Sequence, residues 1–407
     1  MAASAHKNFN NLRTQDNLWS AWRHLYRARR LVKGRTQGAL DEFKSREIKS
    51  IRRINRELGN DTFDFGKARG APIERAGKAP RPIVIPNIEA RIVQRAILDE
   101  LQRVPQLSRY FRNPHSFGGM PKSSQAKAIE AVTAKLLAGA GYYLRSDIRE
   151  FFTRIPREHA VAALAAPLDD RAASLVDRAT RVELENADEL ANIRSLFPTP
   201  ELGAAQGLCL SPLMGNVVLH DFDHAMNSAD VRCIRFVDDF LILGPDEATV
   251  IAAFDKALGI LKALKMTAYD PRRDAAKAKC GPTTHPIEFL GCMVERGRVQ
   301  PSRKARARIL ERVRELLNES AQSFSSPTHS YERKLSAART LQRVAGALQG
   351  WRDAFAFCEH ADDVFTAIDM KVDEQLRAYL DNFQRAFAQA PGKEARLLAG
   401  IPLLSAR

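Results

Sequence analysis

The sequence predicts an α+β fold in which a few strands carry acidic side chains and helices surround them. Two apolar runs flank Asp238 and Asp239 in residues 233–244, a pattern typical of two short buried strands joined by a tight turn. Another apolar strand begins near Tyr142 and ends at Asp147. Because a glycine-rich loop and a helix separate these strands in the sequence, we expect the three carboxylates to gather on one sheet.

The adjacent acids Asp238 and Asp239 have two interpretations. Both side chains can face water in a turn between core strands. Alternatively they hold a divalent cation, because like charges buried side by side are unfavourable unless a cation compensates them. An Asp147 that meets Asp238 in space favours the cation, and hard oxygen ligands favour magnesium or manganese.

The composition is that of a globular protein with a polyanionic partner. The 407 residues are 45% hydrophobic and 27% charged, with 63 Lys and Arg against 48 Asp and Glu, a net charge of +15. Such an excess favours nucleic acid first and an anionic membrane surface second. No apolar signal core and no run of 18 apolar residues occurs, and the five cysteines lack Cys-x-x-Cys spacing. We therefore expect a cytoplasmic protein with reduced thiols that does not enter the membrane.

The first 60 residues are predicted to be helical and basic, with 14 Lys and Arg against 5 Asp and Glu. One apolar face is expected to pack inward: Leu40, Phe43, Ile48, Ile51, Ile54 and Leu58. A second face is crowded with cations: Arg23, Arg27, Arg29, Arg30, Lys33 and Arg35. This crowding favours contact with phosphates over a face that is only solvated.

Residues 61–86 change character, because glycine, proline and basic residues dominate them. The proline-bounded segment 83–85 is predicted to be a short strand in a mobile hairpin that carries Arg75, Lys78 and Arg81. These cations suit a triphosphate. From these residues alone, a surface loop with incidental charge is the favoured interpretation.

The remaining elements follow from periodicity and turn residues. Ser211 and Pro212 predict a helix that begins with the serine as its cap and runs to about residue 226. We expect helices at 87–103, 126–140 and 247–264, two more within 156–200, a turn-rich loop at 113–121 and one strand at 287–294. From residue 301 the chain is predicted to be helical, with a linker at 319–330 and later helices to about residue 388.

Seven stretches, in one order, resemble reverse transcriptases of the bacterial group II intron-like kind. They are 81–94 (RPIVIPNIEARIVQ), 113–118 (NPHSFG), 144–152 (LRSDIREFF), 206–216 (QGLCLSPLMGN), 236–239 (FVDD), 289–291 (FLG), and 348–355 (LQGWRDAF) with 365–369 (FTAID). The resemblance runs from about residue 40 to about residue 390. It implies a right-hand polymerase, with fingers and a palm made of an antiparallel sheet plus helices, and an α-helical thumb.

The resemblance also implies domain boundaries. Residues 1–60 would form a basic N-terminal helical extension, 61–140 the fingers, 141–295 the catalytic palm, and 296–407 the helical thumb and C-terminal region. No cluster of His and Cys follows residue 390, so we expect no intron-type endonuclease.

The resemblance implies a role for each matching site residue. Asp147, Asp238 and Asp239 would be the catalytic, metal-binding triad, with Ile148 also at the metal, in a reaction that joins dNTPs to a primer using two Mg²⁺ or Mn²⁺ ions. The nucleotide site would comprise Lys78, Arg81, Phe152, Gln206 and Gly207. In that site Phe152 would be the steric gate that excludes a 2′-hydroxyl. Either Lys277 or Lys279 would protonate pyrophosphate, and the choice stays open.

Phe236 is where the chain departs from the family, which has Tyr before the x-Asp-Asp. The ring contact to the primer end would survive without the hydroxyl, so fine fidelity is affected and the metal chemistry is not. Ala90 also stands where an acidic residue is common.

The resemblance implies an RNA template, a DNA product and dNTPs as partners. We expect a stand-alone bacterial enzyme, of the abortive-infection, unknown-group or retron-like kind, that copies a dedicated non-coding RNA in anti-phage defence. Two alternatives stay open. One is a maturase-like RNA-binding chaperone, although a pure binder gains nothing from clustered acids. The other is a template-independent or protein-primed DNA polymerase.

Overall fold

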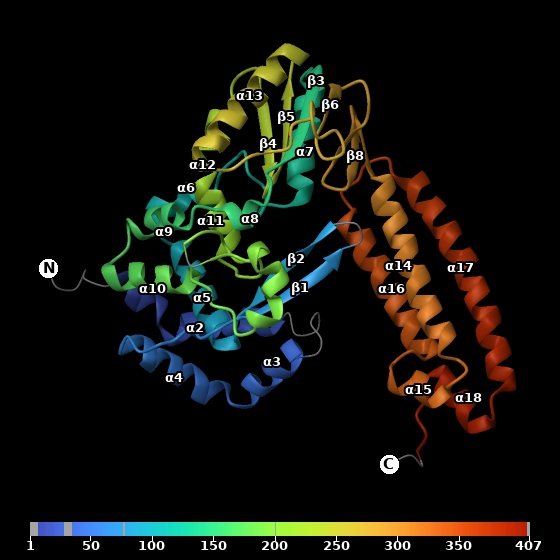
Figure 1. Cartoon of the computed structure of the whole chain (residues 1–407). Coiled ribbons are helices and arrows are strands. Elements are labelled where there is room, and N and C mark those ends of the chain that lie inside the picture. Colours follow the sequence, from blue (N-terminus) through green and yellow to red (C-terminus); the bar gives the residue numbers. More distant parts are fainter. Residues whose placement is uncertain (1–6, 28–34, 76–77, 200, 405–407) are drawn as a thin grey trace. The chain divides into compact units, whose positions relative to one another are not determined.

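The computed structural model describes residues 7–27, 35–75, 78–199 and 201–404 (Figure 1). The chain divides into two compact units. The first comprises Met1–Ala131 with Ala140–Pro282, and the second comprises Val132–Gly139 with Thr283–Arg407. Both units are helical with small antiparallel sheets, so the predicted α+β class is confirmed. In the part of the chain that the structure describes, no helix is long and apolar enough to cross a membrane.

The largest sheet belongs to the first unit and has four antiparallel strands in the order β4-β5-β3-β6. Their bounds are β3 Tyr142–Asp147, β4 Arg232–Phe236, β5 Asp239–Gly244 and β6 Lys279–Pro282. Helix α13, Glu247–Ala263, packs on this sheet, and its Phe254 ring stacks with Phe240 of β5 at 6.4 Å between centroids (Figure 1). The apolar segments on both sides of the Asp-Asp pair therefore form the predicted hairpin, and aromatic side chains pack against the face that points to the core.

Of the four described helices in the N-terminal 60 residues, the first three pack on α5, Ile88–Leu101, and the fourth packs on the second and third. They are α1 Lys7–Leu12, α2 Gln15–Arg27, α3 Arg35–Ser45 and α4 Glu47–Gly59. The predicted apolar face is buried except at Ile48, which is 58% exposed. Its prediction as a core residue was wrong, because Ile51 and Ile54 on the next turns already supply the buried stripe of α4.

The predicted basic hairpin is formed by β1, Arg69–Arg75, and β2, Lys78–Ile85, which pair antiparallel. The rest of the first unit is mainly helical: η3 Pro105–Leu107, α6 Ser108–Phe111, α8 Phe151–Arg154, α9 Arg157–Ala165, α10 Asp170–Thr180, η4 Asp188–Leu196, α11 Ser211–Val218 and α12 His220–Ala225. Helix α7, Gln125–Leu137, crosses the division between the units.

Ser211 does not cap its helix. Leu210 is the residue before the first turn, Ser211 is the first helical residue, and the Ser211 hydroxyl donates a 2.6 Å hydrogen bond to the Ala205 carbonyl instead. The single helix expected up to residue 226 is also two helices, because α11 ends at Val218 and α12 begins at His220.

The second unit contains the sheet β7-β8-β9 and five helices in its described part. The strands are β7 Ile287–Phe289, β8 Cys292–Glu295 and β9 Arg298–Pro301. The single strand expected at 287–294 is a hairpin, because Leu290 and Gly291 both have positive φ, at 48° and 76°. Two such residues form the tight turn that reverses the chain.

The helices of the second unit are α14 Arg303–Gln322, α15 Pro327–Glu332, α16 Ala337–Ala354, α17 Asp362–Gln389 and α18 Gly392–Ala399. Val313 of α14, Val344 of α16 and Ile368 of α17 share one apolar core. The linker expected at 319–330 is shorter than predicted, since α14 continues to Gln322 and α15 starts at Pro327.

Candidate active site

The three predicted carboxylates lie at the same end of the four-stranded sheet. Asp147 ends β3 and is the direct cross-strand partner of Asp239, the first residue of β5. Directly opposed residues of an antiparallel pair have Cβ atoms about 4.5–5.5 Å apart on one face. Asp238 occupies the turn just before, and its carbonyl accepts a 3.0 Å hydrogen bond from the amide of buried Ile148. The backbone therefore brings the three acids and Ile148 together.

The turn that carries Asp238 is strained. Phe236 pairs with Asp239, which leaves Val237 and Asp238 as a two-residue loop. Val237 has a φ of 60°, a conformation that β-branched residues rarely adopt. Glycine is the usual residue at this position of a type II′ hairpin turn. Strain of this kind costs about 1–3 kcal/mol and persists only where surrounding contacts hold it.

Arg235 supplies the first of those contacts from β4. Its Nη1 donates a 2.8 Å hydrogen bond to the Val237 carbonyl. Its Nε and Nη2 each donate a 2.6 Å bond to one carboxylate oxygen of Asp223 on α12. Arg235 is 0% exposed and Asp223 is 1% exposed. The hairpin turn is thus tied to a fully buried ion pair.

The loop at residues 113–119 supplies the other contacts. Ser116 and Arg235 form an isolated parallel β-bridge. The Phe117 amide donates a 2.8 Å hydrogen bond to the Arg235 carbonyl. A Cβ added at Gly118 would lie 2.4 Å from the Val237 nitrogen, so only glycine fits there without a shift of the backbone. The turn-rich loop predicted from sequence therefore braces the acidic hairpin.

Asn216 of α11 joins the loop to the ion pair. Its Oδ1 accepts hydrogen bonds from Ser116 Oγ at 3.0 Å and from Arg235 Nη2 at 3.1 Å. Its Nδ2 donates to the Gly118 carbonyl at 3.1 Å. Sequence reasoning missed the roles of Asp223 and Arg235, although a charged residue inside the apolar run 233–236 was a signal for a buried partner.

The electrostatics at Asp238 are those of crowded acids. Burial raises the pKa of the Asp238 carboxyl, and the negative charge of Asp147 raises the pKa further. The guanidinium groups of Arg81 and Arg235 act in the opposite direction. Arg81, which belongs to β2, is therefore close enough to the acids to influence their charge.

The donor set fits a hard divalent cation. Carboxylate oxygens are the ligands that magnesium and manganese prefer, and a cation would offset the repulsion between Asp147 and Asp238. Among the described residues, no three His, Cys, Asp or Glu side chains already form a group that could hold a metal ion.

The predicted nucleotide residues lie on two segments that touch. Gln206 forms an isolated parallel β-bridge with Ile83 of β2. The Gln206 carbonyl accepts a 2.7 Å hydrogen bond from the Val84 amide. A Cβ added at Gly207, where φ is 120°, would lie 2.3 Å from the Val84 carbonyl oxygen, so glycine permits this approach. Arg81 is an exposed residue on the same strand. The backbone of Lys78 begins β2, but its side chain lies outside the described residues.

Phe152 and Phe236 are both half-buried. Phe152 lies in the short helix α8 just after the Asp147 strand, with its ring against Phe151 at 5.3 Å between centroids. Its carbonyl accepts a 2.7 Å hydrogen bond from the Ala204 amide, which links it to the Gln206 loop. Phe236 is the last residue of β4 and pairs with Asp239.

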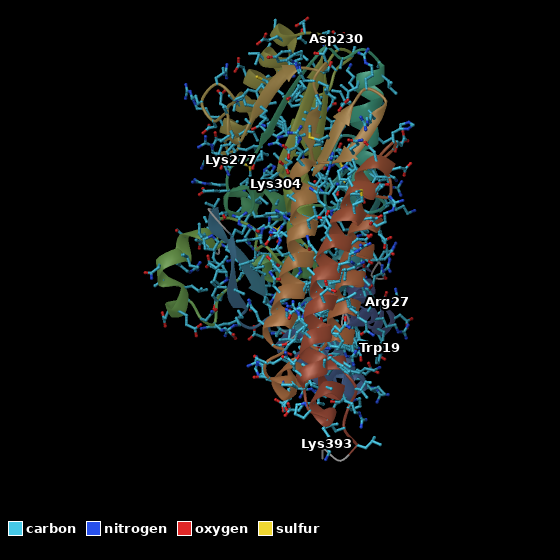
Figure 2. The ribbon with its side chains drawn as sticks, turned by 90° about the vertical axis from the view of Figure 1, so that its right-hand side faces the viewer. Trp19, Arg27, Asp230, Lys277, Lys304 and Lys393 are labelled. Atoms are coloured by element: carbon cyan, nitrogen blue, oxygen red, sulfur yellow. The ribbon has the colours of Figure 1, made fainter. Side chains whose placement is uncertain are left out.

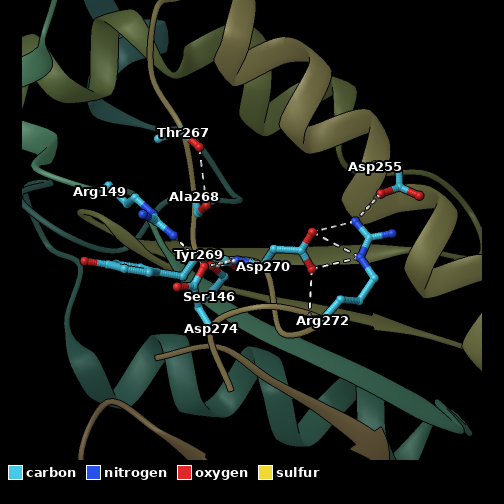
Figure 3. A network of polar contacts seen from close by, with 9 residues as sticks. All are labelled: Ser146, Arg149, Asp255, Thr267, Ala268, Tyr269, Asp270, Arg272 and Asp274. Atoms are coloured by element: carbon cyan, nitrogen blue, oxygen red, sulfur yellow. Dashed lines mark hydrogen bonds and ion pairs between the residues drawn. The ribbon is translucent and has the colours of Figure 1, made fainter. Parts of the chain in front are cut away.

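The segment at 267–278 lies along the end of β3 (Figure 3). The Tyr269 amide donates a 3.2 Å hydrogen bond to the Asp147 carbonyl, and Ser146 Oγ donates a 2.6 Å bond to the Tyr269 carbonyl. The Arg149 guanidinium lies over the Tyr269 ring at 4.3 Å and pairs with Asp274. This segment fixes the strand end that carries Asp147.

The two candidate lysines have different surroundings. Lys277 Nζ lies 5.6 Å from the centre of the Tyr269 ring, and the Lys277 carbonyl accepts a 3.4 Å hydrogen bond from Arg145. Lys279 begins β6 and pairs with Arg145 of β3. These contacts place both lysines beside the strand that ends at Asp147.

The basic surface of the N-terminal helices contains two grooves. Arg23, His24 and Arg27 of α2 face Arg95 of α5, and Arg103 just after that helix, across a groove of about 480 Å³ (Figure 2 labels Arg27). A second groove, of about 770 Å³, follows α3 and α4, and its cations are Lys44, Arg46, Lys49, Arg52, Arg53 and Arg56. Of the predicted phosphate-contacting residues, Arg23 and Arg27 are exposed, whereas Arg29, Arg30, Lys33 and the Arg35 side chain lie outside the described residues.

A known family model matches the central region of the chain. Residues 73–294 match the family model described as reverse transcriptase (RNA-dependent DNA polymerase). The chain is 26% identical over 184 residues to an uncharacterized 91 kDa protein in the cob intron of Schizosaccharomyces pombe, covering 45% of this chain and 21% of that protein. It is 25% identical over 193 residues to the putative COX1/OXI3 intron 1 protein of Saccharomyces cerevisiae, covering 45% of this chain and 22% of that protein. The chain thus spans about a fifth of the length of these curated relatives.

Solved structures show weaker similarity. An apo telomerase from Candida tropicalis, truncated from its C-terminal domain, has a TM-score of 0.41 and 12% identity, covering 58% of this chain and 55% of that chain. A partial Cas6-RT-Cas1–Cas2 complex has a TM-score of 0.37 and 19% identity, covering 64% and 43%. Scores of this size do not establish a shared overall fold, so the assignment rests on the family match, which covers more than half of the sequence and contains all three acids. The chain belongs to the reverse transcriptase (RNA-dependent DNA polymerase) family.

Proposed function

We propose that this protein is an RNA-directed DNA polymerase that adds dNTPs to a primer at the centre formed by Asp147, Asp238 and Asp239. The observation that carries this proposal is the direct pairing of Asp147 with Asp239 beside the strained Asp238 turn. Adjacent carboxylates at a sheet end serve poorly as a structural element, because their repulsion destabilises the fold unless a cation is bound.

The three carboxylates, with Ile148 beside them, would hold Mg²⁺ or Mn²⁺. When bound, two such ions would stabilise the attacking 3′-hydroxyl oxygen and the leaving pyrophosphate of an in-line displacement. The chain itself keeps the donors in place: β3 and β5 set the spacing of Asp147 and Asp239, and the Arg235 hydrogen bond fixes the turn that presents Asp238.

The remaining site residues would bind the nucleotide and primer. Arg81 would contact the triphosphate, because a guanidinium forms paired hydrogen bonds with phosphate oxygens, and Lys78 would assist from the same strand. Gln206 and Gly207 would line the pocket, where glycine leaves room for a ligand. Phe152 would exclude a 2′-hydroxyl, and Phe236 would contact the primer end.

The RNA template would bind through electrostatic contacts that include the grooves of α2, α3, α4 and α5. The supporting observation is the concentration of exposed arginines and lysines there. We further propose, from the sequence resemblance alone, a bacterial enzyme in the cytoplasm that copies a dedicated non-coding RNA in anti-phage defence. A role as an RNA-binding chaperone is a second candidate, because the same basic surface would support it.

Primer extension distinguishes these functions. Purified protein with magnesium, dNTPs and a primed RNA should synthesise DNA, and replacing both Asp238 and Asp239 with Ala should abolish synthesis while RNA binding persists. The exposed Asp246→Ala variant is the matched control, since Asp246 caps α13 and lies outside the carboxylate centre. RNA binding by the wild type without any synthesis would favour the chaperone.

The basic surface has its own test. RNA affinity should fall steeply with salt, because phosphate contacts release counterions. Replacing Arg27, Arg29 and Arg30 with Ala should weaken binding and reduce the salt slope. A flat salt response would show that this face is only solvated.

A further inference from the structure

Arg235 and Asp223 form a buried ion pair beneath the turn that presents Asp238. Burying a guanidinium and a carboxylate costs several kcal/mol of desolvation, and an apolar pair of similar size is often equally stable. A gain in stability therefore does not explain why this ion pair is buried here. Its geometry suggests a role in positioning, because the guanidinium contacts the turn directly.

The contact reaches the peptide that leads into Asp238. Arg235 Nη1 donates its 2.8 Å hydrogen bond to the Val237 carbonyl, and that carbonyl belongs to the peptide bond joining Val237 to Asp238. Fixing the orientation of this peptide fixes the start of the Asp238 residue. The other two nitrogens are held by Asp223 at 2.6 Å, so the guanidinium cannot rotate away.

Asn216 and Gly118 further restrict the movement of the Arg235 guanidinium and of the turn at Val237. Asn216 accepts from Arg235 Nη2 at 3.1 Å and donates to the Gly118 carbonyl. Gly118 in turn leaves no space beside Val237, since even one added methyl would lie 2.4 Å from its nitrogen. Helices α11 and α12, the 113–119 loop and strand β4 thus converge on one turn.

We propose that Arg235, oriented by Asp223 and Asn216, is a positioning residue that holds the strained Val237–Asp238 peptide in the conformation that binds the divalent cation. A lysine cannot replace it, because a single ammonium lacks the planar fork that serves Asp223 and the Val237 carbonyl at once. This inference rests on the proposed function of the carboxylate centre.

The test compares Arg235→Lys with a matched control, Arg157→Lys. Arg157 is also a buried arginine of the first unit, 2% exposed, and it donates hydrogen bonds to the carbonyl and the carboxylate of Asp177, which join α9 to α10. Full-length wild type and both variants are titrated with Mn²⁺ alone, bound and free ion being separated by electron paramagnetic resonance. Urea unfolding of each protein gives its stability, and primer extension gives its rate as a function of magnesium concentration.

We expect Arg235→Lys to weaken Mn²⁺ binding by about tenfold or more, the scale seen when residues that orient metal ligands are changed. The magnesium concentration for half-maximal synthesis should rise in parallel, and saturating magnesium should restore part of the rate. Arg157→Lys should lose stability yet bind Mn²⁺ like the wild type. If Arg235→Lys does not fold, Asp223→Asn keeps the volume of that side chain and should give the same shift in Mn²⁺ affinity.

Equal Mn²⁺ affinity in the wild type and Arg235→Lys would overturn the inference, as would an equal loss in the Arg157→Lys control. Failure of the proposed function gives a different result, because the wild type itself would then neither bind Mn²⁺ at this centre nor extend a primer.

Discussion

Both carboxylate oxygens of Asp223 accept hydrogen bonds from Arg235, each at 2.6 Å, and neither side chain is more than 1% exposed. The ion pair joins helix α12 to the strand that leads into the acidic turn. The same guanidinium donates a hydrogen bond to the Val237 carbonyl, so the acidic turn is in contact with a fully buried ion pair.

Asp223→Ala should destabilise the protein strongly. It leaves the Arg235 charge buried without its carboxylate partner, and breaking a buried pair in this way costs about 3–5 kcal/mol. Urea unfolding measures the change. Glu315→Ala is the control, because the Arg312–Glu315 pair on α14 is solvent-exposed and should contribute less than about 1 kcal/mol. Similar losses in the two variants would contradict the importance of the buried pair.

Gly118→Ala should disturb the acidic turn. The new methyl would overlap the Val237 backbone, and overpacking of this kind costs about 1–3 kcal/mol. We expect lower stability together with slower DNA synthesis. The matched control is Gly259→Ala in the interior of α13, where nothing lies within 4 Å of the added Cβ. That change should stabilise the helix by about 0.5–1 kcal/mol, and a harmless Gly118→Ala would show that the loop does not brace the hairpin.

Stability should fall with acid partly through His115. Burial, helped by the positive charges of Arg232 and His224 and opposed by Asp223, lowers the pKa of His115 from 6.5 to about 4. The unfolded chain therefore takes up a proton as the pH falls below 6.5 while the folded protein resists, so this contribution to stability is present above 6.5 and is lost between 6.5 and about 4. Because the ring is partly exposed, we expect about 1 kcal/mol or less.

Urea unfolding of the wild type and His115→Gln at neutral and mildly acidic pH measures this effect. Glutamine can still accept the 2.8 Å hydrogen bond that Arg232 donates to His115 Nδ1. The variant should lose less stability on acidification than the wild type. Identical pH slopes would show that another group is responsible.

Phe152→Ala should relax sugar selection. If the half-buried ring excludes a 2′-hydroxyl, its removal should raise ribonucleotide incorporation relative to deoxynucleotide incorporation by about tenfold or more. Competition between the two nucleotides on one primed template measures the ratio. Phe152→Leu, which keeps an apolar side chain of intermediate size, should fall between the wild type and Phe152→Ala. An unchanged ratio in Phe152→Ala would refute the gate.

The local sequence pattern predicted the secondary structure correctly where a single physical cause, the burial of apolar side chains, determined it. The hairpin at Asp238 followed from apolar alternation on both sides of a polar turn, and the helices of residues 1–60 followed from their apolar stripes.

The local sequence pattern gave wrong or incomplete predictions where long-range contacts or the backbone conformation determined the structure. Residues 287–294 have the alternation of one strand, but positive φ at Leu290 and Gly291 turns them into a hairpin. Ser211 has the side chain of a helix cap, but its hydroxyl donates a hydrogen bond to the Ala205 carbonyl instead. The partnership of Asp223 with Arg235 joins two elements, and no local signal in α12 marks its aspartate as the buried partner.

The most direct test of the central claim is primer extension by Asp238→Asn. Asparagine keeps the size of the side chain while removing the charge that a divalent cation requires. With magnesium, dNTPs and a primed RNA, the wild type should extend the primer, and Asp238→Asn, folded as judged by urea unfolding, should be slower by about a thousandfold or more, a barrier increase of about 4 kcal/mol. Extension by the variant within tenfold of the wild-type rate, roughly 1.4 kcal/mol, would contradict the assignment of this carboxylate centre.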